Sequence, residues 1–196
     1  MTRPPELPCR QFPVAAPATL AVLWAILLGL PDGAVAQAHD HANRDHRSAY
    51  AGQHDREIAA LAPEEIDGLL AGDGLGMALP AELNGYPGPK HVLEMAGELS
   101  LSVDQRSQVE AVFAEMQATA RELGARLVAL EGELDQAFKD RTVTGERLVT
   151  LLSSIAGERA RLRATHLSAH LKLVPVLSPE QVEQYERLRG YREAPQ

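Results

Sequence analysis

The stretch Leu101-Ser102-Val103-Asp104-Gln105 and its near copy Leu177-Ser178-Pro179-Glu180-Gln181 enclose the part of the chain that decides the fold. Between them, apolar residues recur at alternating steps of three and four, the spacing of one face of an α-helix. The first run is Val109, Phe113, Met116, Ala120, Leu123, Leu127, Leu130 and Leu134, and the second is Leu148, Leu152, Ile155, Leu162, Ala169 and Leu173. A turn-prone break at 140–145 separates the runs, so the sequence predicts an antiparallel helical hairpin.

The two copies also predict where helices begin. Ser102 can accept a hydrogen bond from the backbone N–H of Gln105, whose side chain can reach back to the N–H of Ser102. Ser178 and Gln181 can form the same capping box, with a proline at the first helical position. Thr144 is a further cap. We therefore expect an all-α, four-helix domain over 88–192, with helices near 90–99, 102–139, 144–174 and 178–191.

The first 36 residues have the features of a secretory signal peptide. Arg3 and Arg10 precede an apolar run over 14–30, and Ala34-Val35-Ala36 predicts cleavage after Ala36. An uncleaved membrane anchor is the alternative, because the run approaches the length needed to span a bilayer. The only cysteine, Cys9, lies in this segment, so the exported chain would contain no disulfide and no thiolate ligand.

Two further segments precede the helical domain. Residues 37–56 are poor in apolar side chains and are predicted to be a disordered arm. This arm carries His39, His41, His46 and His54, which either form a weak chelating site or belong to a solvated tail. Residues 57–87 are expected to be an extension of short helices and Gly/Pro-rich linkers, with one helix starting at Pro63 and stopped by Gly72, and another turn over 77–84.

The net charge of −8 gives no electrostatic reason to expect a nucleic-acid partner, but it leaves cationic partners and metal ions open. No nucleophile elbow is present, and the glycine-rich stretch 72–77 lacks the strand and lysine of a phosphate loop. We therefore do not expect an enzyme.

His166 and His170 are the sharpest candidates for chemistry. At positions i and i+4 they share one helical face and could bind a single ion. His91, Glu94 and Met95 on the preceding helix could fold towards the same end. Such a set would suit Zn, Cu or Ni. The alternative is that His166 is a hydrogen-bonded core residue and His170 a surface residue.

The arrangement of the hairpin gives three further expectations. If the two capping phrases face each other, His166 lies opposite Val112. Arg159, on the apolar face, is expected to pair with a glutamate across the hairpin. Three glycines inside the helices would mark bends or close approaches of a partner helix: Gly124, Gly132 and Gly157.

The doubled phrase behind a signal peptide resembles the Spy/CpxP family of periplasmic stress proteins and, more loosely, periplasmic metal-related proteins of the ZraP and CnrX type. The resemblance covers about 88–192 and rests on Leu101, Ser102, Gln105, Leu177, Ser178 and Gln181. It implies a hooked four-helix fold, usually a dimer whose concave face binds unfolded or stress-damaged proteins.

Three functions follow as hypotheses. The one we favour is an ATP-independent periplasmic chaperone that binds envelope proteins. The first alternative is a periplasmic protein that binds or senses a heavy metal through His166 and His170. The second is a regulatory partner of a membrane sensor of envelope stress. Because a lone hairpin leaves much of its apolar face exposed, we also expect a homodimer.

Overall fold

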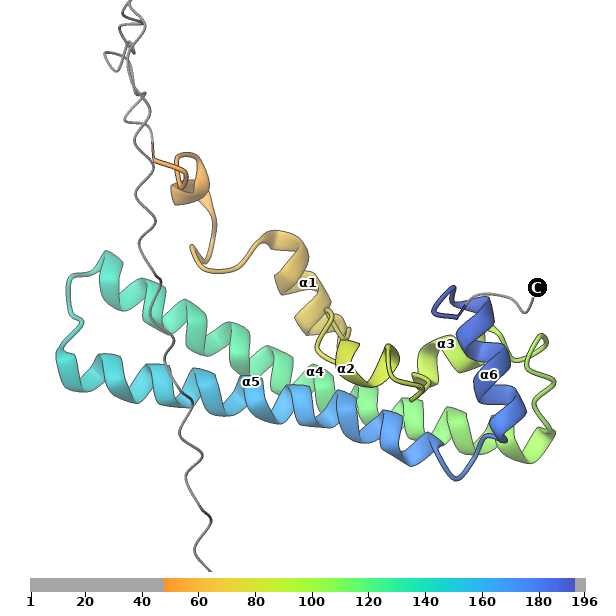
Figure 1. The fold of residues 1–196 in the computed structure, drawn as a ribbon. Coiled ribbons are helices and arrows are strands. Elements are labelled where there is room, and N and C mark those ends of the chain that lie inside the picture. Colours follow the sequence, from red (N-terminus) through yellow and green to blue (C-terminus); the bar gives the residue numbers. More distant parts are fainter. Residues whose placement is uncertain (1–47, 193–196) are drawn as a thin grey trace, which may run out of the picture. The chain divides into compact units, whose positions relative to one another are not determined.

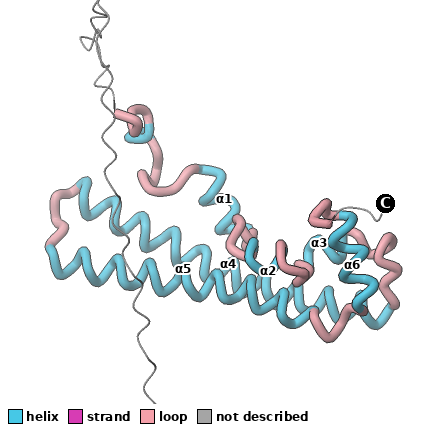
Figure 2. Tube along the Cα trace, in the orientation of Figure 1, coloured by secondary structure: helices cyan, strands magenta, loops and turns pink. Residues whose placement is uncertain are grey.

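The computed structural model describes residues 48–192, which belong to one compact unit (Figure 1). Within this range the fold is all-α, without a β-strand, as predicted (Figure 2). The elements are η1 (Gln53–Asp55), α1 (Pro63–Ala71), α2 (Leu79–Glu82), α3 (Pro89–Glu94), α4 (Val103–Lys139), α5 (Gly145–Leu173) and α6 (Pro179–Leu188). None of these helices is long and apolar enough to span a bilayer. The predicted signal peptide and residues 37–47 of the arm lie outside the described residues.

Helices α4 and α5 form the predicted antiparallel hairpin, and each long helix begins at its predicted cap (Figure 1). The backbone N–H of Gln105 donates to Ser102 Oγ over 3.1 Å, and Ser102 N–H donates to Gln105 Oε1 over 3.0 Å. Ser178 and Gln181 repeat this box, with distances of 3.3 Å and 2.9 Å. Thr144 caps α5 by accepting from the backbone N–H of Arg147.

The two capping glutamines also bind each other. Gln105 Nε2 donates to Gln181 Oε1 over 2.8 Å, and Gln181 Nε2 donates to Gln105 Oε1 over 3.1 Å. Gln181 Nε2 also lies 3.1 Å from the carbonyl oxygen of Leu99, so the starts of α4 and α6 are fastened together with the end of the α3 turn. Neither capping box by itself predicts this contact between the two glutamines.

The register predicted for the hairpin is wrong. Lys172 Nζ lies 2.7 Å from Glu115 Oε2, and Arg159 Nη2 lies 3.0 Å from Glu131 Oε1. The predicted register would place both acidic partners more than two turns away along α4. The cause is the non-helical turn after α5, which advances the chain further per residue than a helix does. The expectation that Arg159 pairs with a glutamate across the hairpin is confirmed.

Most of the predicted apolar face is buried. The fully buried members are Val109, Ala120, Leu123, Leu127, Ile155, Leu162, Ala169 and Leu173. Leu152 is an exception: it is exposed, and its neighbour Leu151 is buried in its place. The step of four from Leu151 to Ile155 continues the buried face of α5, which explains the difference.

The 57–87 extension packs on the hairpin and covers its apolar face. Leu61 and Leu69 join the same core cluster as Leu123 and Leu127 of α4. Gly124 allows this contact, because a Cβ at that position would lie 2.1 Å from the carbonyl oxygen of Leu69. The chain's own extension thus covers part of the face from which a homodimer was inferred, and the homodimer stays a prediction.

Two helices are shorter than predicted. Helix α3 ends at Glu94 instead of Leu99, and the next residues form turns that contain Gly97, a residue of low helix propensity. Helix α6 ends at Leu188 instead of Tyr191, because Gly190 adopts a left-handed conformation with φ 72°. Gly72 ends α1 in the same way, with φ 76°, as predicted.

Candidate functional site: a histidine pocket

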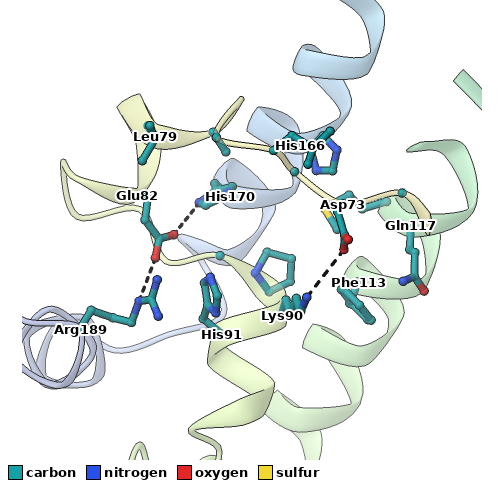
Figure 3. A pocket seen from close by; sticks show the side chains of 18 of the residues that line it. Asp73, Leu79, Glu82, Lys90, His91, Phe113, Gln117, His166, His170 and Arg189 are labelled. Atoms are coloured by element: carbon teal, nitrogen blue, oxygen red, sulfur yellow. Dashed lines mark ion pairs between the residues drawn. The ribbon is translucent and has the colours of Figure 1, made fainter. Parts of the chain in front are cut away.

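A pocket of about 360 Å³ lies where the extension, the hairpin and the end of α6 meet (Figure 3). Three histidines line it, one from α3 and two from α5: His91, His166 and His170. The apolar part of the pocket lining includes Leu79, Phe113 and Met116. The remaining polar lining includes Asp73, Lys90, Glu82 and Arg189. We call this site the histidine pocket.

His166 and His170 occupy successive turns of α5, and both are buried, with 3% and 6% of their surface exposed. His170 Nδ1 donates to the carbonyl oxygen of Tyr86 over 2.7 Å. His166 Nε2 is buried and has no hydrogen-bond partner among the described residues. Burial, assisted by the neighbouring His170, lowers the pKa of His166, so its imidazole is neutral near pH 7. The interpretation of His170 as a surface residue is therefore wrong.

The other predicted site residues are only partly brought together. His91 lines the pocket, and its Nδ1 lies 2.9 Å from Glu94 Oε2. The hydrogen bond from His91 lowers the pKa of Glu94. Met95 packs against the apolar cluster around Val92 instead of lining the pocket. Within residues 48–192, no three His, Cys, Asp or Glu side chains stand close enough together to hold a metal ion as they are placed.

A buried carboxylate that the sequence reasoning missed forms one side of the pocket. Glu82 is 7% exposed. Its Oε1 accepts hydrogen bonds from the hydroxyl groups of Tyr185 and Tyr191 and lies 3.3 Å from Arg189 Nε in an ion pair. We call these four residues the Glu82 clasp. The other carboxylate oxygen of Glu82, Oε2, lies 3.8 Å from His170 Nδ1 (Figure 3). Burial and the bond to Glu82 raise the pKa of Tyr185, which stays protonated.

No local signal in the sequence could have revealed the clasp, because its partners lie about a hundred residues apart. Gly88 shows how closely the linker approaches it. A Cβ on Gly88 would lie 3.0 Å from His170 Cε1 and 3.1 Å from Glu82 Oε2. The Gly/Pro-rich stretch 85–89, predicted only as a stop before the main domain, is thus part of the pocket wall.

A second feature of the extension is a series of exposed leucines. Leu70, Leu75, Leu79 and Leu83 lie within fourteen residues of one another and are between 46% and 56% exposed. We call them the leucine row. Leu75 and Leu79 also line the histidine pocket.

Comparison of the chain with family models, with curated proteins and with solved structures gives no match.

Proposed function

We propose that this protein is an exported helical protein of the Spy/CpxP type that binds unfolded or stress-damaged envelope proteins without ATP. The observation that supports this proposal is the leucine row. Apolar side chains clustered on a surface are typical of sites that bind other proteins. An apolar binding surface needs no nucleotide to hold a client whose own apolar segments are exposed, because burial of apolar area drives the association.

The leucines proposed to bind clients are different residues from those that hold the extension in the core. The row lies on the extension, while the core cluster uses other residues of the same segment, such as Leu61 and Leu69. The row can therefore be made polar without removing the contacts that attach the extension to the hairpin.

The test is suppression of aggregation of a chemically unfolded client protein, followed by light scattering without ATP. We expect the natural chain to suppress scattering, and Leu70→Asn, Leu79→Asn and Leu83→Asn combined to remove most of this activity. Val149→Asn with Leu152→Asn is the matched control, because both residues are exposed apolar side chains of α5 outside the row. The proposal fails if the natural chain does not suppress aggregation, or if the two variants lose activity equally.

A further inference from the structure

Two histidines of the pocket have their Nδ1 atoms bonded to oxygen acceptors. His170 Nδ1 lies 2.7 Å from the carbonyl oxygen of Tyr86, and His91 Nδ1 lies 2.9 Å from the carboxylate of Glu94. Because a carbonyl oxygen can only accept, His170 carries a proton on Nδ1, and in the neutral ring Nε2 bears the lone pair. The carboxylate favours the same tautomer of His91. Histidines that bind metal through Nε2 are commonly oriented in this way.

His166 adds a third imidazole with an unused nitrogen. Its Nε2 is buried without a hydrogen-bond partner in the described part of the chain. Buried polar atoms are nearly always paired, so an unpaired one in a pocket wall points to a missing ligand.

We infer that the histidine pocket binds one divalent transition-metal ion through Nε2 of His166 and His170, with Nε2 of His91 as the third ligand. His166 and His170 lie one turn apart on the buried face of α5, the spacing at which two rings can share an ion. His91 must move together with Glu94, keeping the bond at Nδ1, to complete the set, since no three such groups converge among residues 48–192 as they stand. Its side chain is 33% exposed and is therefore the one with room to move.

The charges around the pocket do not oppose a dication. Lys90 lies 3.7 Å from Asp73, and Arg189 lies 3.3 Å from Glu82, so both cations that line the pocket have acidic partners. Imidazole ligands suit Zn, Cu and Ni better than Mg or Ca.

The experiment is calorimetric titration of the full protein with Zn²⁺ and Ni²⁺ alone, together with titration by Co²⁺ followed by visible absorption. His39, His41 and His46 are replaced by alanine in every sample, so that the histidine-rich arm does not contribute. We expect one ion per chain, visible Co²⁺ bands that indicate nitrogen ligands, and release of protons on binding. His166→Gln with His170→Gln should abolish binding.

Two single variants test the roles of the remaining residues. His91→Ala should weaken the affinity at least tenfold, and its side chain is exposed enough for the fold to survive. Glu94→Gln should weaken it by about tenfold to a hundredfold, as expected of a residue that orients a ligand. His54→Ala is the matched control, because His54 is exposed on η1 and should leave binding unchanged.

Circular dichroism of each variant checks that the helices are retained. The inference is overturned if the protein with the arm histidines replaced binds none of the three ions, or if binding persists in the folded double variant. It is equally overturned if His91→Ala and His54→Ala bind alike, because the third ligand would then lie elsewhere. Client binding through the leucine row is measured separately, so failure of either proposal leaves the other standing.

Discussion

The extension packs on the hairpin through α1 and is joined to α6 and the residues after it through the Glu82 clasp, and these two attachments differ in kind. At α1 the contact is apolar: Leu61 and Leu69 pack with Leu123 and Leu127 over the close approach at Gly124. At the Glu82 clasp the contact consists of hydrogen bonds and an ion pair. Apolar burial attaches a segment without fixing the direction of any atom, whereas hydrogen bonds fix both distance and direction. The histidine pocket lies beside the Glu82 clasp, whose hydrogen bonds fix the positions of the side chains around it.

The largest effect is expected from breaking the polar attachment. Glu82→Ala removes the acceptor of two hydroxyl groups and the partner of Arg189 in a buried site, which should lower the free energy of unfolding by about 3 kcal/mol. Urea unfolding followed by circular dichroism measures this loss. Glu122→Ala, at an exposed position of α4, should change stability by less than about 0.5 kcal/mol. If the two variants are equally stable, the clasp has no structural role.

A smaller effect is expected from a side chain that separates α1 from α4 at the apolar attachment. Gly124→Ala places a methyl group 2.1 Å from the carbonyl oxygen of Leu69, so α1 must move, and we expect a loss of about 2 kcal/mol. Gly157→Ala is the matched variant, since its Cβ meets nothing within 4 Å, and it should gain about 0.5–1 kcal/mol from helix propensity. Thermal unfolding should therefore show shifts of opposite sign. Two shifts of the same sign would contradict the close contact.

The histidine pocket and the apolar attachment should also differ in their response to pH. Burial lowers the pKa of His166 below its ordinary 6.5, so the unfolded chain takes up a proton that the folded chain resists. The stabilisation is therefore complete above about pH 6.5 and falls as the pH decreases below it, by about 1.4 kcal/mol per pH unit at most. His166→Leu should reduce this dependence in urea unfolding between pH 7.5 and 5.5. Leu127→Ala, in the apolar attachment, should leave it unchanged.

The smallest effect concerns the capping boxes, which are chemically the same at both helix starts. Ser102→Ala and Ser178→Ala should each cost about 1 kcal/mol. Gln105→Ala and Gln181→Ala should not be additive, because each glutamine also binds the other. A double-mutant cycle in urea measures this coupling. Additive losses would mean that each capping box acts alone.

The features predicted from the sequence are those whose causes are local. The caps at Ser102, Thr144 and Ser178 use atoms within three residues, and the periodicity of α4 and α5 follows from one apolar face. The histidine pair was found because positions i and i+4 always share a face. These signals are properties of single helices, so they do not depend on how the helices pack against the rest of the chain.

The missed features all depend on parts of the chain that are distant in sequence. Glu82 is joined to residues 103 and 109 positions later, and nothing near it indicates that it is buried. The register of the hairpin depends on the conformation of the turn at 174–178, which periodicity does not report. Gly124 is a partial exception. A glycine inside a long helix indicated a close neighbour, but the sequence did not identify that neighbour as α1.

The order of the chain has a consequence for how the protein is made. The tyrosines and the arginine that hold Glu82 come after both long helices in the chain, whereas Glu82 itself comes before them. A growing chain can therefore pair α4 with α5 well before the clasp can close. The wall of the pocket is assembled last, and any chain cut short before Tyr185 would keep its hairpin but lack this wall. The pocket therefore depends on residues that are made after both helices of the hairpin.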